Sequence, residues 1–151
     1  MAEDNTGKMK DDNTSMLEAV VENTELGKNT LDDIIPMAQD GLFKAELLRE
    51  KNVYHDINGE AHMCLAAGGE QAKGQTPMAK MNVKLGIGMK TIADKSTRNL
   101  AEMLAQGCGQ GVMDCLKSQK DYPNATPGAK KLMQKLQDFE QDSMVKMGEF
   151  L

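Results

Sequence analysis

The chain has 151 residues, of which 40% are hydrophobic and 27% charged, a balance typical of a folded domain rather than a disordered chain. Aromatic residues make up only 3%, whereas methionine occurs 13 times. This composition argues against a β-sandwich or barrel and favours helices. The formal net charge of −5 disfavours nonspecific binding to nucleic acids, whose phosphates require a cationic surface.

The N-terminal residues 1–13, MAEDNTGKMKDDN, predict a disordered acidic tail, and residues 14–151 a single domain. The tail lacks the apolar core of a signal peptide, and no apolar run in the chain is long enough to span a bilayer. The three cysteines, Cys64, Cys108 and Cys115, are too few and odd in number for a disulfide framework. We expect them to be buried apolar groups in a reducing compartment, so the protein is predicted to be cytoplasmic, without membrane insertion.

The first predicted helix begins at Thr14 or Ser15, either of which can cap it, and Glu18 completes a capping box with Ser15. Pro36 lacks an amide hydrogen and is expected to kink the helix or end it nearby. Asp40 can then cap the next helix. The apolar face of the first helix is predicted to consist of Leu17, Val20, Val21, Thr24, Leu31, Ile34, Ile35 and Ala38.

The second predicted helix runs from about Leu42 to Ala67, with a weak centre at Asn58–Gly59. A flexible loop is expected at about 68–76, where glycines and a proline cluster. One face of this helix recurs at alternating steps of four and three, as in a heptad seam. Its members are Phe43, Leu47, Glu50, Tyr54, Ile57, Ala61, Cys64 and Gly68.

The third predicted helix starts at Thr76–Pro77 and meets no strong terminator before Asp121–Tyr122–Pro123. At 1.5 Å per residue it would be roughly 65 Å long, against about 35–40 Å for the other helices. Its N-terminal part is rich in methionine and would remain partly uncovered in a simple bundle. Either the helix breaks at Gly86–Ile87–Gly88, or the overhang is buried against a second subunit, which we prefer.

The glycine-rich run Gly107–Gly111 lies on the apolar stripe of this third helix. Each glycine lowers helix stability by roughly 1 kcal/mol relative to alanine. Either a neighbouring element approaches closely there, or the helix is locally irregular. We prefer the close approach, because the stripe continues on both sides of the run.

The fourth predicted helix begins at Thr126–Pro127, a cap followed by a proline at the first helical position. Its apolar face is predicted to comprise Ala129, Leu132, Met133, Leu136, Phe139, Ser143, Met147 and Phe150. Four amphipathic helices joined by short loops predict an all-α, antiparallel up-down-up-down four-helix bundle.

Two segments, Asp94–Leu151 and LEAVVENTELGKNTLDDII near the start, resemble an uncharacterised bacterial family of ferritin-like four-helix bundles. The most specific pieces are DKSTRNLAEML and KKLMQKLQDFE. They are helix-surface patterns, so the resemblance implies a fold and no particular activity. The wider superfamily holds two irons with glutamates and Glu-x-x-His motifs. Here the only histidines are His55 and His62, neither of them three residues after a glutamate, so we do not expect this iron site.

A weaker, nonstandard metal site around Glu50, His55 and His62 remains the alternative, because the two histidines share one helix face. Glu50, Glu102 and Glu140 fall on or near inner faces; we expect their carboxylates to reach water at the edge of the core and to pair with Lys or Arg. The methionines are expected to fill the core rather than bind a soft metal.

These observations predict a non-enzymatic helical bundle, without catalytic residues or cofactors. It is expected to act as a homodimer, or by binding another protein, through the N-terminal part of the third helix. The alternative is a metal-binding or redox bundle with a nonstandard carboxylate and histidine site.

Overall fold

The computed structural model describes residues 11–68 and 92–151, which form four α-helices and contain no strand. The predicted all-α class is therefore confirmed for this part of the chain. The helices are α1 (Asp12–Ile34), α2 (Gly41–Ala67), α4 (Thr97–Asp121) and α5 (Pro127–Gly148), and a short 3₁₀ turn, η1 (Ile35–Met37), follows α1. None of the helices described is long and apolar enough to cross a membrane.

Each helix begins at a side chain that caps its first turn. Asp40 and Thr126 accept hydrogen bonds from the backbone amides of Phe43 and Ala129, as predicted. The predicted cap of α1 was wrong: Asp11 accepts from Thr14 N at 2.6 Å, and the helix starts at Asp12. Residues 11–13 thus belong to the folded domain rather than to the tail, whose other residues lie outside those described.

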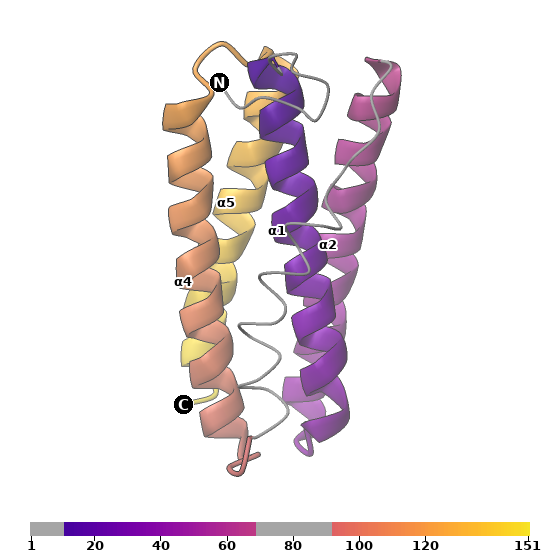
Figure 1. The fold of residues 1–151 in the computed structure, drawn as a ribbon. Coiled ribbons are helices and arrows are strands. Elements are labelled where there is room, and N and C mark those ends of the chain that lie inside the picture. Colours follow the sequence, from indigo (N-terminus) through magenta and orange to yellow (C-terminus); the bar gives the residue numbers. More distant parts are fainter. Residues whose placement is uncertain (1–10, 69–91) are drawn as a thin grey trace.

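Two antiparallel hairpins, α1–α2 and α4–α5, make up the bundle (Figure 1). The start of α1 lies beside the turn that follows α4, where Asn124 N donates to Asp12 Oδ2 at 2.8 Å. Since α2 returns along α1, α2 and α4 run in the same direction (Figure 1). The predicted up-down-up-down order is therefore wrong at this step. The prediction assumed a short loop, but the 23 residues from 69 to 91 could extend over roughly 75 Å, enough to join opposite ends of the bundle.

The third predicted helix does not continue back through residues 92–96. These residues are not helical, and Ser96 caps the start of α4 by accepting from Asn99 N. Asp94 strengthens this start, because its side chain accepts from Ser96 N and its backbone oxygen from the Asn99 amide. The hydrogen bonds of Ser96 and Asp94 therefore start a helix at Thr97, although the apolar stripe alone predicts one longer helix. Three predicted features lie outside the described residues. They are the loop beyond Gly68, the start of the third helix at residues 76–91 with its alternative break at Gly86–Gly88, and the dimer overhang.

The apolar stripes of the four helices meet along the bundle axis. Phe43 packs edge-on against Phe150, and Tyr54 against Phe139, each pair joining α2 to the C-terminal hairpin. Glycines 107–111 are helical, as predicted. The methionines divide between two environments: Met16, Met133 and Met147 are buried, whereas Met63, Met113 and Met144 are exposed. Core filling therefore explains only some of them.

Candidate functional site

Polar side chains gather inside the bundle, about halfway along α2 and α5. We call this group the carboxyl cluster; it consists of Glu50 and Tyr54 from α2, Cys108 and Cys115 from α4, and Glu140 and Ser143 from α5. All six residues are buried. Buried carboxyl groups are unusual unless a cation accompanies them, so the cluster is the most distinctive chemical feature of the interior.

Glu140 is 3% exposed and sits between three helices. The Tyr54 hydroxyl donates a hydrogen bond to its Oε2 at 3.0 Å, and the Cys115 thiol lies 3.8 Å from its Oε1. Gly111 of α4 makes the room, because a Cβ at that position would lie 2.6 Å from Glu140 Cδ. The close approach predicted at the glycine run is thus confirmed at Gly111, where the approaching group is the Glu140 side chain.

Glu50 is 2% exposed, and its Oε1 has no hydrogen-bond partner among the described residues. Ser143 lies beside it and favours its ionised form, but the Ser143 hydroxyl makes no hydrogen bond of good geometry either. Arg49 favours the ionised form of Glu50 through its charge, but it binds Glu46 at 2.6 Å on the surface.

Burial raises the pKa of both Glu50 and Glu140 to about 7. Hydrogen bonding opposes this shift only in part, from Ser143 at Glu50 and from Tyr54 and Asn23 at Glu140. We had expected these carboxylates to reach water and pair with Lys or Arg, and this was wrong for both. Only Glu102 is exposed as predicted. The spacing of apolar residues along one helix shows that a glutamate lies at the edge of the apolar face. It does not show whether a neighbouring helix covers that edge and excludes water from the carboxylate.

The cysteines divide in the same way as the methionines. Cys108 and Cys115 are buried as predicted, whereas Cys64 is exposed, contrary to expectation. Burial raises the pKa of the Cys108 thiol to about 12, with the charges of Glu50 and Glu140 adding to the effect. Burial also raises the pKa of Cys115. Since the thiolate is the reactive form, neither buried cysteine is set up as a nucleophile.

The alternative metal set of Glu50, His55 and His62 is not assembled. Both histidines are exposed, and His62 Nε2 lies 4.0 Å from Glu25 Oε1 on the surface. Five residues correspond to about 140° of rotation around a helix, so His55 points away from the face that carries Glu50. Over the two described stretches, no three His, Cys, Asp or Glu side chains are grouped so as to hold a metal ion.

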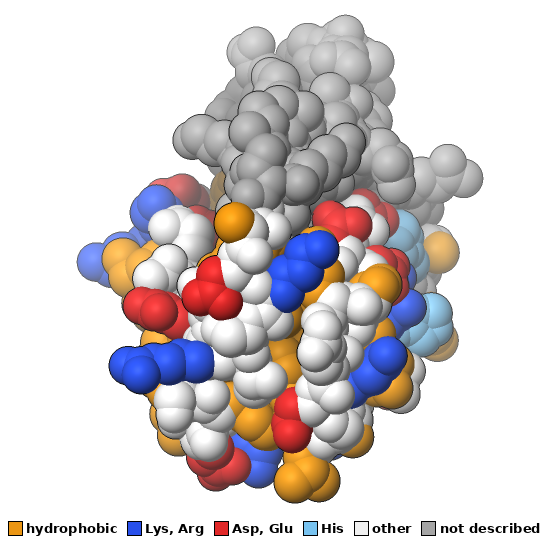
Figure 2. All heavy atoms as spheres, turned by 90° about the horizontal axis from the view of Figure 1, so that it is seen from below, with side chains coloured by type: hydrophobic (Ala, Val, Ile, Leu, Met, Phe, Trp, Pro, Cys, Tyr) orange, Lys and Arg blue, Asp and Glu red, His pale blue; other side chains and the backbone are white. Residues whose placement is uncertain are grey.

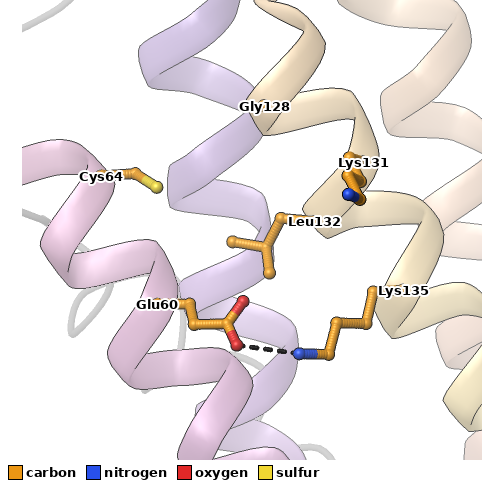
Figure 3. A pocket seen from close by; sticks show the side chains of 6 residues that line it. All are labelled: Glu60, Cys64, Gly128, Lys131, Leu132 and Lys135. Atoms are coloured by element: carbon orange, nitrogen blue, oxygen red, sulfur yellow. Dashed lines mark hydrogen bonds and ion pairs between the residues drawn. The ribbon is translucent and has the colours of Figure 1, made fainter.

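A groove of about 340 Å³ opens on the surface between α2 and α5 (Figure 3). We call it the α2–α5 groove; it is lined by Glu60, Cys64, Gly128, Lys131, Leu132 and Lys135. Lys135 Nζ binds Glu60 Oε1 across it at 2.8 Å, and Leu132 projects between the two helices (Figure 3). Cys64, which also lines the groove, is exposed.

Sequence reasoning missed both the groove and the full cluster. The relevant signals are present as pairs four residues apart, Glu60 with Cys64 and Lys131 with Lys135, which mark one face of each helix. They become informative only once the order of the helices in the bundle is known. Comparisons of the chain with protein-family models, with curated proteins and with solved structures found no match.

Proposed function

We propose that the chain is a ferritin-like helical bundle that acts by pairing with a second copy of itself rather than by catalysis. The order of the helices supports the ferritin-like assignment. Folds of that kind contain one long crossover connection, as a bundle needs when α2 and α4 run in the same direction. The resemblance of residues 94–151 to ferritin-like bundles agrees with this order.

The chemistry of the interior supports a role without catalysis. The carboxyl cluster is enclosed by packed side chains, and its two thiols are held in their unreactive protonated form. A general acid or base must reach the proton of a substrate, directly or through one water. The three free cysteines also support our inference that the protein works in a reducing compartment, the cytoplasm.

The α2–α5 groove is the observation that carries the pairing proposal. Its lining includes the apolar Leu132, and Met63, which directly precedes Cys64 on α2, is 73% exposed. Lys131 forms no ion pair with any residue that the structure describes. A second copy, with its formal net charge of −5, would bring carboxylates to this lysine while burying the methionine.

Other surfaces support the proposal less well. At the end of the bundle seen in Figure 2, small orange areas alternate with charged side chains of both signs. Scattered exposed apolar side chains of this kind are normal for a monomer. The overhang that we first predicted as the interface lies outside the described residues.

Size-exclusion chromatography with light scattering tests the proposal directly. At micromolar concentration we expect a mass of twice that of one chain. The paired substitution Met63→Glu with Lys131→Glu should return the protein to a monomer, because it removes apolar area and reverses the charge at the groove. A strictly monomeric natural protein would overturn the proposal.

A matched control places the same chemical changes on another helix. Met113 and Lys117 of α4 are also exposed and four residues apart, so Met113→Glu with Lys117→Glu adds the same charges away from the groove. This variant should remain a dimer. If it dissociates as readily as the groove variant, general repulsion and not the groove governs association.

A further inference from the structure

The carboxyl cluster takes its residues from both hairpins of the bundle, whose arrangement Figure 1 shows. Glu50 belongs to the α1–α2 hairpin and Glu140 to the α4–α5 hairpin. The Tyr54 hydroxyl of the first hairpin donates to Glu140 of the second at 3.0 Å, and the Tyr54 ring packs against Phe139 with centroids 4.9 Å apart. A change in charge here therefore acts on the contact between the hairpins.

The surroundings of the two carboxyl groups offer almost no compensating positive charge. From α1 comes only the uncharged Asn23, which donates to Gly111 O and contacts Cys115 Sγ. Within residues 11–68 and 92–151, Arg49 is the one cation that acts on either carboxyl, and its guanidinium is held by Glu46. The titratable and charged groups that face the pair come from two helices: Glu46, Arg49 and Tyr54 from α2, and Cys108, Asp114 and Cys115 from α4. Helix α5 adds the uncharged Ser143 beside Glu50.

A carboxyl group in such a place is held more easily with its proton than without it. Two buried oxygens without hydrogen-bond partners also favour the protonated form. Glu50 Oε1 and Ser143 Oγ are both buried and lack partners among the described residues, and a proton on Glu50 adds a hydrogen-bond donor beside them. At Glu140, the Tyr54 hydroxyl supplies one hydrogen bond in either protonation state.

We propose that protons on Glu50 and Glu140 hold the two hairpins together, and that loss of these protons loosens the packing of α2 against α5. The proton is the ligand of this site, and both hairpins contribute to binding it. The inference does not depend on dimer formation, since neither residue lines the α2–α5 groove.

The sign of the pH dependence follows from linkage. Both carboxyls have a pKa of about 7 in the folded protein, raised from an ordinary value of 4.5. Between these values the folded chain retains protons that the unfolded chain has released. The unfolding equilibrium constant therefore rises with pH across this window, by about tenfold per pH unit for each carboxyl, and levels off above pH 7.

Urea unfolding of the full chain between about pH 5 and about pH 8, in the presence of EDTA, tests the linkage. The unfolding constant of the natural protein should rise by up to about 100-fold per pH unit below pH 7, when both carboxyls contribute. The variant Glu50→Gln with Glu140→Gln should lose this dependence. The control Glu102→Gln with Glu149→Gln, at two exposed glutamates outside the groove, should retain it. Stability that is flat over this range, or a steep dependence in the first variant, would overturn the proposal.

Two measurements keep the proposal testable if the double variant does not fold. In carbon-13 NMR of the natural protein, two glutamate carboxyl signals should titrate near pH 7, and each single Gln variant should remove one. In a Tyr122→Phe background, the tyrosine band of the near-ultraviolet circular dichroism reports on Tyr54 alone, since the chain has two tyrosines and no tryptophan. Its signal should weaken as pH rises through 7. Carboxyls that all titrate below about pH 5, or a Tyr54 signal independent of pH, would contradict the proposal.

Discussion

The carboxyl cluster and the α2–α5 groove both draw residues from α2 and α5 and contain similar chemistry, although α4 also contributes to the cluster. Each has a glutamate of α2, Glu50 or Glu60, and each has a cysteine. In the groove, Glu60 and Lys135 form an ion pair at 2.8 Å with both side chains about half exposed. In the cluster the two glutamates are buried, and neither forms an ion pair with a residue of the described stretches. Residue type therefore does not determine the chemistry of a position; its hydration and neighbours do.

Two glycines explain how the Glu140 carboxyl and the Tyr54 ring fit into the core. Gly111 leaves space for the Glu140 carboxyl, and Gly27 of α1 leaves space for the Tyr54 ring, whose atoms lie 2.5–2.7 Å from where a Cβ would be. At Gly128 in the groove, a Cβ would meet only Thr126 Oγ1, at 3.9 Å, so this glycine makes room for no neighbouring side chain.

The largest expected difference between the two places is in thiol reactivity. In the native protein a thiol reagent should modify Cys64, which is exposed. Cys108 and Cys115 should react at least about 1,000-fold more slowly, because they require the bundle to open at a cost of about 5 kcal/mol or more. Timed labelling followed by mass spectrometry of the peptides checks this. Simultaneous labelling of all three cysteines would contradict the enclosed cluster.

The next largest effect is expected from removal of the Tyr54 side chain. Tyr54→Ala should lower the free energy of unfolding by about 3–5 kcal/mol, because it empties the space beside Gly27 and leaves Glu140 without its donor. Tyr54→Phe keeps the ring and should cost only about 1–3 kcal/mol. Urea unfolding at constant pH measures both. Equal losses would mean that the hydrogen bond, and not the ring, holds the hairpins together.

The sequence was sufficient to predict the helices and most of the core. The predicted apolar positions of α1 from Leu17 to Ile34 are buried, as are those of α5 from Ala129 to Met147 apart from Phe139, which is half-buried. Asp40 and Thr126 cap helices as predicted. These features depend on residues within one or two helical turns of each other, so local periodicity and capping preferences determine them.

The direction of α4 and the burial of Glu50 and Glu140 could not be predicted in this way. Both depend on which helices become neighbours after the chain has passed through residues 69–91, and a single helical stripe does not contain that information. The expected long third helix failed for a related reason. Its apolar stripe extended back through Ile92, but the Asp94 and Ser96 caps, which were not weighed, begin a new helix.

A smaller effect, with a change of sign, distinguishes two glycines of α4. Gly111→Ala should destabilise the protein by about 1–3 kcal/mol, because the new Cβ displaces a buried carboxyl that Tyr54 also holds. At Gly107 a Cβ would meet nothing within 4 Å. Gly107→Ala should therefore stabilise the helix by up to about 1 kcal/mol. Thermal unfolding of the two variants side by side measures the difference, and the same sign in both would refute a special role for Gly111.

The smallest effect is expected in the groove. Breaking the Glu60–Lys135 pair by Glu60→Gln should change the free energy of unfolding by less than about 1 kcal/mol, because both side chains are about half exposed and water solvates either charge alone. The effect should shrink further in high salt, which screens exposed charges. Urea unfolding at low and high salt measures it. A loss as large as that in Tyr54→Phe would show that the groove is as dry as the cluster, and the contrast between the two places would then disappear.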